Sequence, residues 1–153
     1  MKVEIYSRKA IEKLKSTDFP TNTAVISFFT PPNKRNHEQN RVDYRGVCEH
    51  VFYVGAPDID IDILSDYGYT YETYLKEAPA LAEFIRKAVA DGLDIICQCD
   101  YGQSRSAACA AAILQYYEGR GIDIFTDYRY YPNQLVYHKV FDSLKESSST
   151  ESP

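Results

Sequence analysis

IICQCDYGQSRS, residues 95–106, is the segment from which most can be predicted about this chain. Its first residues continue an apolar run that begins at Leu93, and we expect a buried strand over residues 93–97. The centre of the segment, DYGQ, is polar and contains a glycine, as loops do. From Ser104 to Tyr117 the chain is rich in Ala, Ile and Leu, which predicts a core helix. A strand, a short loop and a helix therefore follow one another directly.

The segments on either side repeat this alternation of strands and helices. Short apolar runs that are β-branched or aromatic predict strands, and apolar residues at helical spacing predict helices. We expect strands over residues 3–6, 24–29 and 51–54, a helix capped by Ser7, and helices over residues 80–90 and 135–144. Such an order predicts an α/β domain of three layers, in which helices flank a central, mainly parallel sheet of four to five strands.

Length and charge restrict the class of protein further. The chain has 153 residues, and its 17 basic and 22 acidic side chains give a net charge of −5. One domain over residues 1–145 is expected, followed by a disordered tail over residues 146–153. The acidic balance argues against nucleic acid as a partner, and no segment has the apolar length of a membrane span. Four cysteines are too few for a disulfide scaffold and the N-terminus has no apolar signal core, so we expect a cytoplasmic monomer.

The loop after the central strand has the composition of an anion site. The first N–H groups of a helix have no partner within the helix, and the helix dipole adds positive charge there. Gly102 lets the backbone approach a ligand closely, and the planar guanidinium of Arg105 can bind two oxygens of one anion. Cys99 lies at the start of this loop. Its pKa is expected to fall from about 8.5 into the range of roughly 3.5 to 7.5, which makes the thiolate a nucleophile at neutral pH.

The run from Cys99 to Ser106, CDYGQSRS, resembles the signature loop of the cysteine-dependent protein tyrosine phosphatases, which is Cys, five residues, Arg, then Ser or Thr. Its Gly-x-Ser-Arg-Ser ending is most similar to the compact dual-specificity branch. The flanking helices and the closing segment YPNQLVYHKVFDSL occur in that branch in the same order, so the resemblance covers about residues 24–144. It implies a phosphatase-type phosphate loop between strand and helix, and hydrolysis of phosphomonoesters without a cofactor.

The resemblance also implies a role for each residue of the loop. Cys99 would form a phosphocysteine intermediate, and the hydroxyl of Ser106 would ease departure of the thiolate in the second step. Arg105 would bind the substrate phosphate together with the loop amides, which are those of Asp100, Tyr101, Gly102, Gln103, Ser104 and Arg105. The family usually has His directly before the nucleophile, where this chain has Gln98. Because Gln carries no charge, we expect a less acidic thiol than is usual in the family.

The leaving group of a phosphomonoester needs a proton, which a carboxylic acid above the site would supply. Members of the family carry this Asp on a loop after the preceding strand. Three aspartates, Asp58, Asp60 and Asp62, follow the expected strand over residues 51–54. We predict Asp58 as the general acid because it lies closest to the end of the strand, with Asp60 as the alternative. If the run were extended, all three would instead lie on one solvated face of an edge strand.

Two other functions are compatible with the same loop. A binding module would capture phosphopeptides without turnover, and a rhodanese-like sulfurtransferase would carry sulfur on the same cysteine. For a phosphatase, the expected partner is a phosphorylated protein or a small phosphomonoester. The histidines lack ligand spacing, so we predict no metal site. Cys97 is expected to be a packed core cysteine, with a disulfide that protects an oxidised Cys99 as the alternative.

Overall fold

The structure is a computed structural model that describes residues 1–32 and 41–150, with side chains through residue 146. In this part of the chain four strands form one parallel sheet in the order β1-β4-β2-β3. The strands are β1 (Val3–Ser7), β2 (Thr23–Phe29), β3 (Val51–Gly55) and β4 (Asp94–Cys99). The predicted α/β class with a mainly parallel sheet is confirmed.

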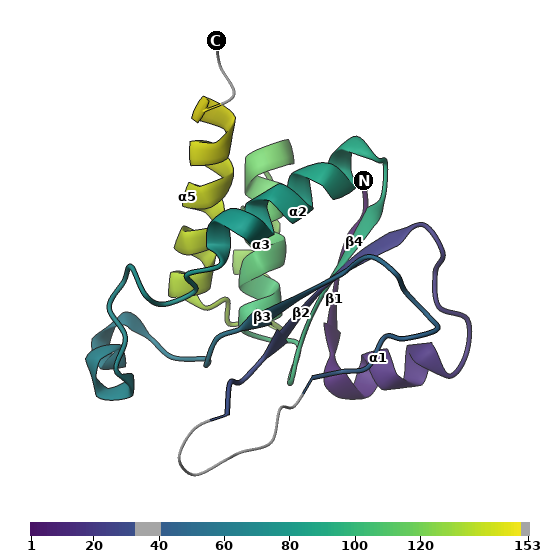
Figure 1. Cartoon of the computed structure of the whole chain (residues 1–153), viewed down its shortest axis with the longest axis horizontal. Coiled ribbons are helices and arrows are strands. Elements are labelled where there is room, and N and C mark those ends of the chain that lie inside the picture. Colours follow the sequence, from purple (N-terminus) through teal and green to yellow (C-terminus); the bar gives the residue numbers. More distant parts are fainter. Residues whose placement is uncertain (33–40, 151–153) are drawn as a thin grey trace.

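The helices form a layer on each side of this sheet. The described residues contain α1 (Arg8–Lys15), α2 (Ala78–Ala90), α3 (Arg105–Glu118), α4 (Ile122–Phe125) and α5 (Gln134–Thr150), and the short 3₁₀ helices η1 (Ile61–Ile63) and η2 (Ser65–Tyr67). α1 lies on one face of the sheet, and α2, α3 and α5 lie on the other (Figure 1). The three predicted layers are therefore present.

Each face of the sheet has its own hydrophobic core. The larger core lies between the sheet and the helices α2, α3 and α5, and the smaller core lies on the α1 side around Ile11. Side chains alternate across a strand, so β4 directs Ile95, Cys97 and Cys99 into the larger core and Ile96 into the smaller one. β4 is paired with β1 on one side and with β2 on the other, so both neighbours hold the end of β4 in place.

β4 ends at Cys99, two residues later than the strand that the sequence predicted. The additional residues are paired with β1, where Tyr6 lies opposite Gln98 and Ser7 lies opposite Cys99. Apolar character alone stops at Cys97, whereas a parallel neighbour can extend a strand through a polar residue such as Gln98. The strand therefore reaches the first residue of the predicted phosphate loop.

The segment that carries the three aspartates is not a strand. Residues 56–60 are irregular, and η1 begins after Asp60. Ile59 is buried whereas Ile61 is 63% exposed, so the two isoleucines do not share one buried face. The alternative in which Asp58, Asp60 and Asp62 line one face of an edge strand is therefore wrong.

The last helix extends further than predicted. α5 runs to Thr150, whereas the sequence predicted a disordered tail from Glu146. Residues 134–152 contain no glycine or proline, so nothing in the backbone ends the helix at Leu144. The remainder of the predicted tail, residues 151–153, lies outside the described residues. No helix of the described ranges, α5 included, combines the length and the apolar character that a bilayer span requires.

Candidate active site

The predicted phosphate loop lies at the carboxyl end of β4, between the last strand residue, Cys99, and the first residue of α3, Arg105. Among the described residues, the backbone N–H groups of Tyr101 to Ser104 find no hydrogen-bond acceptor. The first N–H groups of α3 have no partner inside the helix either. This short stretch therefore offers a series of unused donors, which suits it to bind an anion.

Gly102 packs the loop against the junction of β1 and α1. Its φ of +69° lies in the left-handed region that favours glycine. A Cβ at this position would lie only 2.6 Å from the backbone nitrogen of Ser7. Arg8, the first residue of α1, adds a hydrogen bond from its N–H to the carbonyl of Asp100 at 3.1 Å. The N-terminal strand and helix thus support the loop.

The thiol of Cys99 contacts the hydroxyl of Ser106. Sγ and Oγ lie 3.1 Å apart, and both residues are buried. Cys99 ends the strand and Ser106 lies in the first turn of α3, so this contact connects the two ends of the loop. A hydroxyl at this distance can donate to a thiolate and stabilise its negative charge.

Arg105 is buried, and its guanidinium contacts three groups. Nη1 donates to the carbonyl of Ala56 at 2.8 Å and to the hydroxyl of Thr30 at 3.2 Å. Nη2 forms an ion pair with Asp100 at 3.3 Å. Nε is buried and has no hydrogen-bond partner among the described residues. Because leaving a buried donor unpaired is costly, the unpaired Nε is a donor that a bound anion could satisfy.

Asp58 is the aspartate that contacts the phosphate loop. Its Oδ1 accepts hydrogen bonds from the hydroxyl of Ser104 at 2.7 Å and from the side-chain amide of Asn133 at 2.8 Å. Asp60 and Asp62 are exposed at the start of η1, and no hydrogen bond joins them to a described residue of the loop. The fold therefore brings Asp58 beside the loop and leaves Asp60 and Asp62 apart from it.

Asn133 is a residue of this site that the sequence analysis did not single out. Its Oδ1 accepts the N–H of Val136 at 3.0 Å and so caps the start of α5. Its amide group donates to Asp58 and, at 3.0 Å, to the carbonyl of Ile59. The Pro-Asn pair before an apolar run is a helix-start signal, but that signal does not show what the side-chain amide nitrogen of Asn133 contacts.

The backbone before α5 is bonded to the phosphate loop as well. The N–H of Tyr131 donates to the carbonyl of Gln103 at 2.8 Å, and the N–H of Asn133 donates to the carbonyl of Ser104 at 3.2 Å. Tyr101 on the loop and Tyr131 beside it are 81% and 73% exposed. Residues 131–133 thus support the loop and add an aromatic side chain to its rim.

Gln98 lies on the opposite face of the sheet from Cys99. Its Oε1 accepts hydrogen bonds from the hydroxyls of Ser27 at 2.5 Å and Tyr44 at 2.8 Å. Burial raises the pKa of Tyr44, so its hydroxyl remains a donor well into alkaline solution. Gln98 is therefore part of a buried polar cluster on the α1 side.

Cys97 lies in the larger core with Cys109 of α3. The pKa of Cys97 is raised because its thiol forms a hydrogen bond with Cys109 and because it is fully buried. All four cysteines of the chain are free thiols. The position of Cys97 is that of a packed core cysteine, and no disulfide joins it to Cys99.

Several solved structures have the same arrangement of strands and helices, whereas no family model and no curated protein matches the sequence. A variant of human DUSP28 is 15% identical, with a TM-score of 0.57 over 97% of this chain and 93% of its own. The human tyrosine phosphatase-like serine/threonine/tyrosine-interacting protein is 16% identical, with a TM-score of 0.52 over 94% of this chain and 85% of its own. A leucine-rich repeat and phosphatase domain containing protein from Entamoeba histolytica is 12% identical, with a TM-score of 0.50 over 99% of this chain and 91% of its own. The chain has the compact dual-specificity phosphatase fold.

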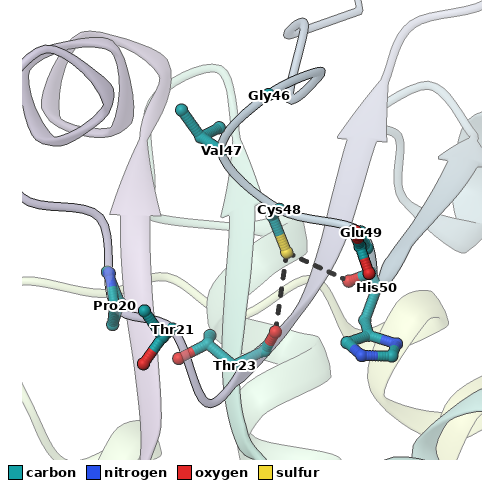
Figure 2. Close-up of a pocket in the computed structure, with 8 residues that line it drawn as sticks. All are labelled: Pro20, Thr21, Thr23, Gly46, Val47, Cys48, Glu49 and His50. Carbon is teal, nitrogen blue, oxygen red and sulfur yellow. Dashed lines mark hydrogen bonds between the residues drawn. The ribbon is translucent and has the colours of Figure 1, made fainter.

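Other candidate sites in this phosphatase fold are separate from the loop. A cavity of about 340 Å³ contains Cys48, whose thiol lies 3.5 Å from the carbonyl oxygens of Thr23 and His50 (Figure 2). Thr23 begins β2 and His50 precedes β3, so this cavity lies at the amino ends of the strands, across the sheet from Cys99. Within the described ranges, no three His, Cys, Asp or Glu side chains come together to hold a metal ion.

Proposed function

We propose that this protein is a phosphomonoester hydrolase that acts through a phosphocysteine intermediate on Cys99. The observation that carries the proposal is the contact of Cys99 with Ser106, beside the unpaired Nε of Arg105 and the unused N–H groups of the loop. A nucleophile is in contact with a donor to its thiolate, and several anion donors belong to the same loop, which are the groups that phosphoryl transfer requires. The phosphatase fold of the chain supports the same function.

In the first step the thiolate of Cys99 attacks phosphorus, and the S–P bond forms while the bond from phosphorus to the leaving oxygen breaks. Arg105 and the loop N–H groups bind the other phosphate oxygens and stabilise their charge. Asp58 gives its proton to the leaving oxygen. We assign this proton to Oδ2, since Oδ1 already accepts hydrogen bonds from Ser104 and Asn133.

In the second step a water molecule attacks phosphorus, and the P–S bond breaks. The carboxylate of Asp58, now without its proton, takes one proton from the water. Ser106 donates a hydrogen bond to the departing thiolate of Cys99, which lies 3.1 Å away in the free protein. Inorganic phosphate is released and the site returns to its starting state, so the cycle is balanced without a cofactor.

The proposal is tested by hydrolysis of an aryl phosphate. The wild-type protein should release phosphate, and Cys99→Ser should lose this activity because a serine hydroxyl at this position is not ionised at neutral pH. Cys48→Ser is the matched control, because Cys48 lies near the amino ends of the strands whereas Cys99 lies at a carboxyl end. Equal rates for wild type and Cys99→Ser would contradict the proposal.

A second candidate function is phosphopeptide binding without turnover. It is favoured by Asp58, whose carboxylate is engaged by two donors, and by Asp100, which already neutralises part of the charge of Arg105. Asp58→Asn separates the two functions, because a hydrolase should lose about a hundredfold in kcat whereas a binding module has no turnover to lose. We do not propose the sulfurtransferase alternative, since the similar structures are named as phosphatase-domain or phosphatase-like proteins.

The proposed substrate is a phosphorylated protein or a small phosphomonoester, and the proposed location is the cytoplasm. Tyr101 and Tyr131 present exposed rings at the rim of the phosphate loop, where the organic part of a substrate would lie. An aryl phosphate is therefore a suitable first probe.

A further inference from the structure

Asp100, the residue directly after Cys99, pairs with the arginine that is proposed to bind phosphate. Its Oδ2 lies 3.3 Å from Nη2 of Arg105. The Arg105 side chain is 5% exposed and the Asp100 side chain is 33% exposed, so the pair is only partly screened by solvent. The carbonyl of Asp100 is held by the N–H of Arg8, which fixes the backbone that carries this carboxylate.

The three nitrogens of the Arg105 guanidinium are in three different situations. Nη1 is fixed by Ala56 and Thr30, Nη2 is occupied by Asp100, and Nε is unpaired among the described residues. An oxyanion that binds a guanidinium through two parallel hydrogen bonds uses adjacent N–H groups. Since Nη1 is already held by the protein, Nε and Nη2 are the pair that remains for a phosphate. Nη2 carries two N–H groups, so Asp100 takes one of them and holds its negative charge beside the pair of nitrogens that a phosphate would use.

We propose that Asp100 is a built-in counter-ion of Arg105 that weakens the binding of phosphate to the loop. In the empty site it balances the buried guanidinium and keeps it in position. When phosphate binds, Asp100 remains a negative charge beside a dianion, which lowers the affinity for the phosphate product and assists its release. This inference rests on the proposed function and deepens it, because it assigns Asp100 as a positioning residue of the same site.

The test is the affinity for inorganic phosphate, measured by calorimetry in the intact protein. Asp100→Asn retains the size of the side chain and an oxygen that can accept from Nη2, but it removes the charge. We expect its Kd for phosphate to fall about tenfold, since a unit charge near a dianion is repelled strongly at the edge of a protein interior. Asp91→Asn, at the exposed end of α2, removes the same charge elsewhere and should leave the Kd unchanged.

Steady-state kinetics give a second readout that a purely structural role would not produce. In Asp100→Asn the KM for an aryl phosphate should fall together with the Kd for phosphate, whereas kcat should not rise, because the product leaves more slowly. If Asp100→Asn does not fold, Asp100→Ser removes the same charge with a smaller side chain and is measured in the same way.

The outcomes separate this inference from the proposed function. If the wild-type protein binds phosphate and hydrolyses the aryl phosphate, but the charge-removing variant binds phosphate no more tightly, the inference is overturned and the proposed function stands. If the wild-type protein neither binds phosphate nor hydrolyses the aryl phosphate, both are overturned. Tighter phosphate binding in Asp100→Asn but not in Asp91→Asn supports the inference.

Discussion

Gly102 of the phosphate loop leaves no room for a side chain, because both its backbone angle and its surroundings exclude one. We predict that Gly102→Ala lowers the free energy of unfolding by about 3 kcal/mol, from the left-handed backbone and from a Cβ too close to Ser7. Gly92→Ala is the control, because Gly92 has the same kind of φ, +72°, but open space around it, and it should cost about 1–2 kcal/mol. Urea unfolding of both variants measures the difference. Equal costs would show that the contact with Ser7 is unimportant.

The two cysteines of β4 should differ in reactivity although they are two residues apart. The raised pKa keeps Cys97 a neutral thiol at pH 7 to 8, and the thiolate is the form that reacts. We therefore predict that iodoacetamide alkylates Cys99 before Cys97, and that inorganic phosphate slows the reaction at Cys99. Fragment mass spectrometry of the peptide that contains both cysteines measures this order. Faster labelling of Cys97 would contradict both the hydrogen bond with Cys109 and the assignment of Cys99 as the nucleophile.

At the scale of elements, Asn133 connects the start of α5 with the aspartate proposed as the general acid. We predict that Asn133→Ala lowers the free energy of unfolding by about 1 kcal/mol through loss of the helix cap, and lowers kcat about tenfold because Asp58 loses a donor that positions it. Ser7→Ala is the matched control, because Ser7 caps α1 through the N–H of Ala10 and does not contact Asp58. It should lose similar stability with a smaller change in kcat. Equal losses of kcat would assign Asn133 a structural role alone.

The pattern of apolar residues was sufficient to predict most elements, because buried strands and helices have distinct periods. It could not predict the end of β4, where Gln98 is polar but is nevertheless buried and accepts hydrogen bonds from Ser27 and Tyr44. It also missed η1 and η2, because short 3₁₀ helices bury little surface and leave no period in the sequence. The position of the phosphate loop was predictable, since it depends on a local strand-loop-helix order.

The contacts that complete the site were not predictable from the sequence. Asp58 is 46 residues from Ser104 and 75 residues from Asn133, so only the folded chain brings these side chains together. The sequence favoured Asp58 over Asp60 because Asp58 lies closer to the end of a strand and follows a proline, Pro57. Its role as the general acid stays a prediction, as do the roles of Cys99, Arg105 and the loop amides.

At the scale of the whole molecule, buried tyrosines should make the protein less stable in alkaline solution. Burial raises the pKa of Tyr44 and Tyr74 above the ordinary value of about 10. Below pH 10 both the folded and the unfolded chain keep these protons. As the pH rises above 10 only the unfolded chain loses them, so the free energy of unfolding falls, by up to about 1.4 kcal/mol per pH unit for each tyrosine.

Urea unfolding at several pH values between 8 and about 11 measures this effect. Tyr44→Phe should make the unfolding free energy fall less steeply above pH 10, by the contribution of one tyrosine. Phenylalanine has no hydroxyl that could ionise in the unfolded chain. Tyr128→Phe is the control, since Tyr128 is 89% exposed and should not change the slope. An unchanged slope in Tyr44→Phe would mean that Tyr44 ionises as readily in the folded protein as in the unfolded chain.

The backbone hydrogen bonds between residues 131–133 and the phosphate loop determine how fast the amides of Tyr131 and Asn133 exchange hydrogen with solvent. The side chain of Tyr131 faces water, yet its amide is bonded to Gln103, and the amide of Asn133 is bonded to Ser104. Neither amide can exchange with deuterium unless the loop separates from the start of α5. The exchange rate of an amide on a surface tyrosine is therefore a direct measure of how often the loop around Cys99 opens.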